Sequence, residues 1–174
     1  MKYIRKTKTD IKDNFLISLL FDRGIIKDEP EYCEKFFNPK KETNEIDSKL
    51  LDNMKEGYNL LMKHLKNKSL IRLIVDPDCD GFTSSTLFYN YLVDNFSQYS
   101  PNIVYHIPEG KEHGLDSIMD WFPENGENCL IVLPDSSSND YEYHKILKDK
   151  GYELLVLDHH LAEKYSQDAI VINN

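Results

Sequence analysis

Residues 70–81 read LIRLIVDPDCDG, an apolar run that ends in three closely spaced aspartates and a glycine. The apolar part is short and rich in Ile, Leu and Val, which is typical of a buried strand. Gly81 allows a tight backbone turn, after which we expect a helix to begin near Thr83 or Ser84. The stretch therefore predicts a strand, an acidic turn and a helix in direct succession.

The same rhythm repeats along the rest of the chain. Four further apolar segments are predicted to be strands: 102–108, 128–135, 152–158 and 169–173. Helices are predicted between them: 83–96, 115–122, 139–151 and 161–165. Strands that alternate with helices predict an α/β fold, with a mostly parallel twisted sheet of about five strands flanked by helices on both faces.

The residues before this region are predicted to be mostly helical. One helix should end at Gly24, a second short one should follow Pro30, and a third should be capped by Asp47 or Ser48. Two parts are therefore predicted: a helical N-terminal extension (1–69) and an α/β domain (70–174).

The bulk composition narrows the function. The formal net charge of −9 argues against non-specific affinity for nucleic acid, so such a role needs a local basic patch or bound cations. No apolar run approaches the roughly 18 residues of a membrane span, and no secretory signal is evident. Cys33, Cys79 and Cys129 are scattered without a CxxC pair, which predicts neither disulfides nor a thiolate zinc site. We expect a cytoplasmic protein.

Acidic residues stand at the ends of three predicted strands, at Asp76, Asp135 and Asp158. In parallel sheets, functional residues lie just past the carboxyl ends of strands, near a switch in strand order. The first strand end also carries Asp78 and Asp80, and three carboxylates so close repel one another unless a cation or a helix N-terminus compensates them. The pattern indicates a concentrated acidic site at one edge of the sheet.

Each element has a plainer interpretation when taken alone. The acidic turn could be a solvated turn or a calcium loop, but a calcium loop of the EF-hand type needs a Glu about twelve positions after its first Asp. The segment after Asp76 offers none. Asp135 alone could cap the helix that follows it. Only the joint placement of these residues favours a metal site.

Adjacent histidines, His159 and His160, follow Asp158 directly. Imidazoles bind transition metals, and a neighbouring carboxylate can orient a ligating ring; the alternative is a polar strand end with solvated histidines. Carboxylates mixed with imidazole suit Mn²⁺ or Mg²⁺ better than a structural zinc site. Two such ions about 3.5–4 Å apart would clamp a phosphate, which indicates phosphoryl-transfer chemistry.

Three motifs in this order resemble the first three motifs of the DHH phosphoesterase superfamily: DPDCDG (76–81), LPD (133–135) and LDHH (157–160). Further segments are similar to the N-terminal part of RecJ single-strand exonucleases: LLFDRGI (19–25), FFNP (36–39) and IPEGKEHGL (107–115). The resemblance implies a Rossmann-like DHH domain and a phosphodiester hydrolase that uses Mn²⁺ or Mg²⁺.

The resemblance also implies metal ligands. Asp78 would serve one metal ion and Asp80 the second, while Asp135 would bridge both. His159 would be a further ligand. Asp76 matches the first acidic position of the RecJ version, so we include it among the expected ligands.

Four more residues receive roles from the resemblance. His160 would face the scissile phosphate as a charge stabiliser or proton donor, and Asp158 would support the histidine pair. His113 and Gly114 lie in a segment that looks like the family's glycine-containing loop, so we expect them to face the substrate.

The chain also departs from the family pattern. A fourth motif, which supplies another Asp ligand, and the smaller C-terminal DHHA1-type domain have no counterpart here. We expect either a fragment of a longer protein or a short form completed by a partner chain. The loop at 107–115 looks shorter than its RecJ counterpart and lacks that loop's Arg. These departures put the activity of the isolated chain in question.

Three functions stay open at this point. The leading one is a Mn²⁺- or Mg²⁺-dependent exonuclease on single-stranded DNA in repair, recombination or replication. The second keeps the chemistry but takes short oligoribonucleotides or cyclic dinucleotides. The third is a non-catalytic, RecJ-related replication scaffold, which the missing fourth ligand favours and the clustered acidic residues disfavour.

Overall fold

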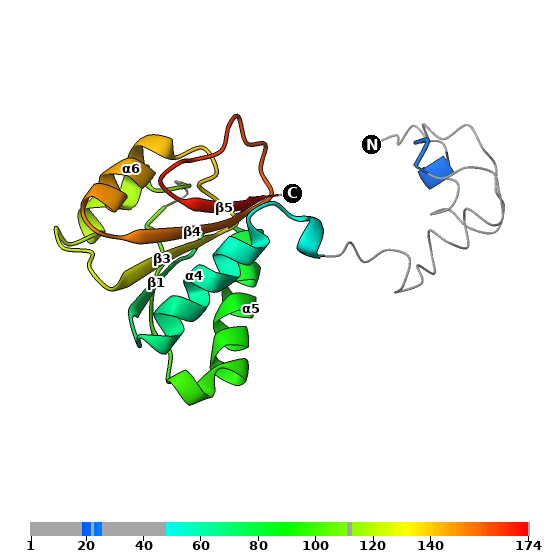
Figure 1. Ribbon diagram of the computed structural model, residues 1–174. Helices are drawn as coiled ribbons and strands as arrows, with labels where there is room; N and C mark the ends of the chain where they lie inside the picture. Colours follow the sequence, from blue (N-terminus) through cyan, green and yellow to red (C-terminus); the bar gives the residue numbers. More distant parts are fainter. Residues whose placement is uncertain (1–18, 22, 26–47, 111–112, 174) are drawn as a thin grey trace. The chain divides into compact units, whose positions relative to one another are not determined.

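The computed structural model describes residues 19–21, 23–25, 48–110 and 113–173 (Figure 1). The chain divides into two compact units, Met1–Ile46 and Asp47–Asn174. In the first unit the described residues form the end of a helix. Gly24 has a left-handed φ of 67°. Its N–H donates to the carbonyl of Phe21 at 2.9 Å, and the N–H of Ile25 donates to Leu20 at 3.0 Å. This pair of bonds is a Schellman motif, so the predicted helix stop at Gly24 is confirmed.

The second unit is built on a five-stranded sheet. Its strands are β1 Leu70–Ile74, β2 Asn102–His106, β3 Cys129–Pro134, β4 Glu153–Asp158 and β5 Ile170–Asn173. They lie in the order β2-β1-β3-β4-β5, and every neighbouring pair is parallel. The five predicted strands and the parallel sheet are confirmed. Strand order reverses between β1 and β3, which is where such sheets place their ligands.

Two helical layers enclose the sheet. The helical elements are η1 Ser48–Leu50, α4 Met54–Lys66, α5 Cys79–Asn95, η2 Ser97–Tyr99, η3 Asp116–Trp121 and α6 Tyr141–Asp149. Helices α4 and α5 cover one face, whereas η3 and α6 cover the other (Figure 1). All six residues of β3 are buried, because it lies in the middle of the sheet with helices on both faces. Strand β2 is an edge and stays largely exposed.

Alternate residues of β3 supply the two cores. Ile131 and Leu133 pack toward Ile118 of η3 and Leu147 of α6. Leu130 and Val132 face the opposite way, into the core that α4 and α5 complete. Helix α4 packs on the sheet and belongs to the second unit, which begins at Asp47. The predicted domain boundary at residue 69 stays a prediction.

Three local predictions were wrong. Helix α5 begins at Cys79, four residues before Thr83, because the Asp78 side chain accepts the N–H of Gly81 at 2.9 Å and starts the helix earlier. Helix α4 begins after Asn53, and Ser48 instead opens the short η1. Residues 161–165 form no helix; Leu161 is 89% exposed, so the segment has no buried apolar face to hold one.

Two expectations lie outside the described residues: the short helix after Pro30 and a cap at Asp47. In the part of the chain that the structure describes, no helix combines the length and apolarity that crossing a membrane requires.

Candidate metal centre

The acidic loop after β1 is shaped by the start of α5. Asp76 is buried, and Asp78 caps the helix through its bond to Gly81. A Cβ on Gly81 would lie 2.4 Å from the carbonyl oxygen of Asp76, so only glycine lets the helix begin this close to the strand. Asp80 occupies the first turn of α5, where the helix dipole favours negative charge. The loop therefore gathers three carboxylates at the switch point of the sheet.

The loop after β3 approaches the histidines that follow β4. The N–H of Asp135 donates to the carbonyl of Leu157 at 2.8 Å, which pins the loop to the next strand. His159 Nε2 then lies 3.0 Å from Asp135 Oδ1. Asp135 and Ser137 have left-handed φ values of 66° and 75°, which strain residues other than glycine. The loop that carries a predicted ligand thus contains two strained backbone positions.

Asp158 organises the histidine pair from beneath. Its Oδ1 accepts the N–H of His159 at 2.7 Å and lies 2.7 Å from Nδ1 of His160. Its Oδ2 accepts the N–H of Ser138 at 3.0 Å. Burial alone would raise the pKa of Asp158, but the hydrogen bonds from Ser138 and His160 outweigh it and lower the pKa to about 2. The bond to Asp158 in turn raises the pKa of His160. Asp158 is therefore an ionised anchor that orients His160.

The surroundings of Asp135 disfavour its ionised carboxylate. Burial raises the pKa of Asp135, and the charges of Asp78 and Asp80 raise it further, whereas His159 and His160 lower it. A divalent cation would reverse this balance by favouring the ionised carboxylate.

Two groups of side chains are arranged so that each could hold a cation. One contains Asp135, His159 and His160, and the other contains Asp76, Asp78 and His113. Within each group the potential ligand atoms lie within 4.8 Å of one another. Asp80, which the structure also describes, belongs to neither group, although it is close enough to act on the pKa of Asp135.

Buried oxygens without partners show that a cation fits. Among the described residues, Oδ1 of Asp76 and Oδ2 of Asp135 are buried and accept no hydrogen bond. A buried carboxylate oxygen without a partner is unfavourable unless a cation compensates it. Carboxylate oxygens combined with imidazole nitrogens are suitable donors for Mn²⁺ or Mg²⁺.

His113 and Gly114 lie beside this centre. His113 Nδ1 is 2.7 Å from Asp76 Oδ2, so the side chain faces a carboxylate as well as solvent. Gly114 lines a cavity of about 280 Å³ together with Asp76, Asp135, His160 and residues 136–140. That cavity borders both candidate groups, through Asp135 and His160 of one and Asp76 and His113 of the other.

Two further residues at the centre were not predicted. Asp140 Oδ2 accepts the N–H of Leu115 at 2.8 Å, which fixes the loop that carries His113. Asn173, at the end of β5, donates to Ser138 and to the carbonyl of His160. The available signal was positional: Asn173 is a polar residue at a strand end, at the same edge of the sheet as the aspartates.

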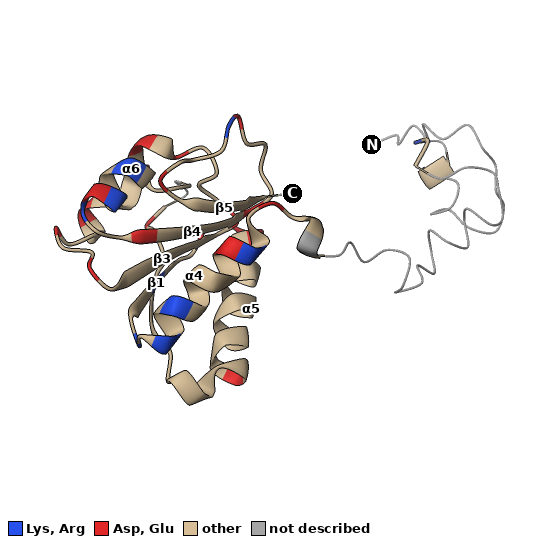
Figure 2. Ribbon diagram, viewed as in Figure 1, with Lys and Arg blue, Asp and Glu red and all other residues tan. Residues whose placement is uncertain are grey.

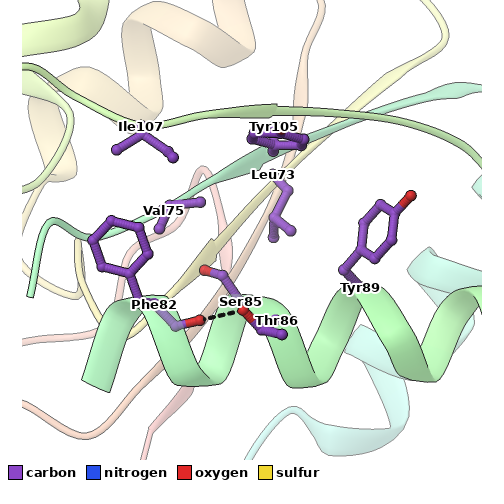
Figure 3. Close-up of a pocket in the computed structure, with 8 residues that line it drawn as sticks. All are labelled: Leu73, Val75, Phe82, Ser85, Thr86, Tyr89, Tyr105 and Ile107. Atoms are coloured by element: carbon purple, nitrogen blue, oxygen red, sulfur yellow. Dashed lines mark hydrogen bonds between the residues drawn. The ribbon is translucent and has the colours of Figure 1, made fainter. Parts of the chain in front are cut away.

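A second hollow lies away from the acidic centre, between α5 and the edge strand β2. It measures about 200 Å³, and Figure 3 shows Phe82 and Tyr89 of α5 facing Tyr105 and Ile107 across Leu73 and Val75. None of its lining residues is charged. Figure 2 shows that α5 carries little charge, whereas α4 carries both signs. The hollow therefore offers a cation no charged ligand.

Comparisons with known proteins find a family and several relatives that this chain resembles. The family model described as "DHH family, N-terminal domain" matches residues 70–174. The putative SPbeta prophage-derived single-strand DNA-specific exonuclease YorK of Bacillus subtilis is 35% identical over 176 residues, a match that covers 100% of this chain and 28% of YorK. The single-stranded-DNA-specific exonuclease RecJ of Thermus thermophilus is 27% identical over 124 residues, or 71% of this chain and 18% of RecJ. The chain thus spans less than a third of the length of these relatives.

Solved structures show the same fold. RecJ from Thermus thermophilus in complex with Mn²⁺ superposes with a TM-score of 0.55 at 21% identity, covering 71% of this chain and 17% of that one. A second exonuclease RecJ bound to manganese gives a TM-score of 0.60 at 23% identity, covering 74% of this chain and 33% of that one.

Proposed function

Since the chain belongs to the DHH family, we propose that it is the metal-binding part of a phosphodiester hydrolase that removes nucleotides from single-stranded DNA. One observation carries this proposal: carboxylates and imidazoles from three strand ends converge on one cavity at the switch point. The relatives named as single-strand DNA-specific exonucleases support the choice of substrate.

We assign the cation ligands to Asp76, Asp78, Asp80, Asp135 and His159. Divalent cations bound there supply Lewis-acid stabilisation of the charge that develops on the phosphoryl oxygens. Mn²⁺ is our first choice over Mg²⁺, because the site offers imidazole as well as carboxylate and the solved RecJ structures contain manganese. The further Asp ligand that the resemblance implies stays a prediction.

His160 is the proposed catalytic residue beside the cations. Its Nδ1 is engaged by Asp158, so its Nε2 is left to face the cavity and donate a hydrogen bond to the scissile phosphate or the leaving oxygen. The raised pKa of His160 favours the protonated ring that this role requires. His113 and Gly114 border the same cavity, which supports a position next to the substrate.

The negative charge of the chain fits this assignment. With a net charge of −9, the protein attracts a polyanion only where cations neutralise the acidic cluster. Single-stranded DNA is then held at the metal centre and not by a general basic surface. We also propose a role in DNA repair, recombination or replication, and a cytoplasmic location.

The experiment measures release of mononucleotides from end-labelled single-stranded DNA by the full chain with Mn²⁺. We expect release that Asp80→Ala and Asp135→Ala abolish, whereas Asp149→Ala, which removes an exposed carboxylate on α6, retains it. Activity that survives in both Asp80→Ala and Asp135→Ala would overturn the proposal.

Two other results would favour a different function. Hydrolysis of oligoribonucleotides or cyclic dinucleotides in place of DNA, under the same metal conditions, would move the protein to the small-substrate branch of the family. Failure of the wild-type chain to bind Mn²⁺ in a calorimetric titration would favour a scaffold.

A further inference from the structure

We propose that Asn173 is a positioning residue that holds together the two loops of the metal centre, an inference that rests on the proposed function. Asn173 ends β5, and it is the register partner of Asp158, which ends β4. The two side chains therefore lie next to each other at the carboxyl ends of the strands, where the site lies.

The contacts of Asn173 reach both loops. Its Nδ2 donates one hydrogen to Ser138 Oγ at 2.7 Å and the other to the carbonyl oxygen of His160 at 2.8 Å. Ser138 belongs to the loop that begins at Asp135, and His160 belongs to the loop after β4. A carbonyl oxygen can only accept, so the amide nitrogen must face His160.

Asp158 joins the same two loops as a hydrogen-bond acceptor, whereas Asn173 joins them as a donor. Its carboxylate accepts the N–H groups of Ser138 and His160, at 3.0 Å and 3.2 Å. Asn173 donates to the acceptor atoms of these residues, and Asp158 accepts from their donors. Together the two side chains fix Ser138 against His160 from both sides, and hence Asp135 against His159.

The loop after β3 needs such support. Asp135 and Ser137 both hold left-handed backbone conformations, which are unfavourable for residues that carry a Cβ. Without bonds to neighbouring strands the loop would relax, and Asp135 would move from its position 3.0 Å from His159. Residues that orient ligands in this way typically affect metal affinity about 10- to 100-fold when they are replaced.

The test replaces Asn173 by Asp, which keeps the shape of the side chain and removes both donors. Asn53→Asp is the matched control, because Asn53 Nδ2 also donates to β5, at 2.9 Å from the carbonyl of Val171, but touches neither loop. Mn²⁺ affinity is measured by calorimetry, and stability is measured by urea unfolding. Hydrogen exchange at the Ser138 and His160 amides is measured in the metal-free protein.

We expect Asn173→Asp to weaken Mn²⁺ binding about 10- to 100-fold and to speed exchange at both amides. Asn53→Asp should lower the free energy of unfolding but leave Mn²⁺ affinity and exchange at the two amides near the wild-type values. Ser138→Ala, which removes one partner of Asn173, should also weaken Mn²⁺ binding. If Asn173→Asp does not fold, the Mn²⁺ affinity of Ser138→Ala tests the inference.

Wild-type Mn²⁺ affinity in a folded Asn173→Asp variant, or equal losses in Asn173→Asp and Asn53→Asp, would overturn the inference. Unchanged Mn²⁺ affinity in Ser138→Ala would overturn it as well. A wild-type chain that binds no Mn²⁺ would instead contradict the proposed function, so the two failures are distinguishable.

Discussion

We expect Asp158→Asn to lower the free energy of unfolding of the metal-free protein by about 3–6 kcal/mol at neutral pH. The buried carboxylate of Asp158 receives hydrogen bonds from Ser138, His159 and His160. An Asn side chain has the same shape, but it has one acceptor oxygen in place of two and turns an NH₂ group toward a donor.

The magnitude follows from the pKa and the hydrogen bonds. The pKa of Asp158 falls from 3.8 to about 2, because hydrogen bonds from Ser138 and His160 outweigh the effect of burial. At roughly 1.4 kcal/mol for each unit of pKa, the interval between 3.8 and about 2 corresponds to about 2–3 kcal/mol. A buried N–H left without an acceptor adds about 1–3 kcal/mol.

The contribution of Asp158 to the free energy of unfolding depends on pH. Because the pKa is lower in the folded protein than in the unfolded chain, the contribution is complete above the unfolded value of 3.8 and is lost as the pH falls through about 2. The difference between wild type and Asp158→Asn should therefore shrink as the pH is lowered across this range.

Urea unfolding of both proteins with a chelator, at pH 7 and near pH 3, measures this difference. Asp149→Asn serves as the control, because Asp149 is exposed and pairs with Lys145 on the same helix. An equal loss in Asp158→Asn and Asp149→Asn, or a difference that does not change with pH, would refute the reasoning.

Four further results are expected. Gly81→Ala should weaken Mn²⁺ binding at least tenfold, because its Cβ would meet the backbone of Asp76 at 2.4 Å and displace the acidic loop; unchanged calorimetric affinity would contradict this. Ser137→Gly should raise the free energy of urea unfolding by about 1 kcal/mol, since glycine adopts a φ of 75° without strain, and a loss would speak against strain in this loop. His113→Asn should lower Mn²⁺ affinity and leave the metal-free thermal midpoint near the wild-type value, because the side chain is 57% exposed; a variant that binds Mn²⁺ normally would remove His113 from the site. Mn²⁺ at 100 times its Kd should stabilise the folded chain by about 2.7 kcal/mol in thermal or urea unfolding, and the same gain in Asp135→Ala would show that binding occurs elsewhere.

The fold was predictable because the central strands are buried on both faces. A continuous apolar run such as Cys129–Pro134 is typical of a strand in the middle of a parallel sheet. The start of α5 was missed because Gly81 suggests a turn, whereas the cap by Asp78 places it inside the first helical turn. Residues 161–165 have helix-forming composition, but composition alone did not show that Leu161 lies in solvent.

The candidate site was predictable to the extent that its groups follow strands. Asp76, Asp135 and Asp158 each end or follow a strand of a parallel sheet, so the same edge of that sheet brings them together. Asn173 and Asp140 were missed because their contacts depend on the register of β5 and on the path of the loop before η3. Such long-range relations leave no local pattern in a single sequence.

The most direct test of the metal centre is an anomalous difference map from crystals of the full chain grown with Mn²⁺. We predict manganese density among the assigned ligands, Asp76, Asp78, Asp80, Asp135 and His159, with His113 beside Asp76. Crystals that contain Mn²⁺ but show no peak there, or that show it only at other surface carboxylates, would contradict the account.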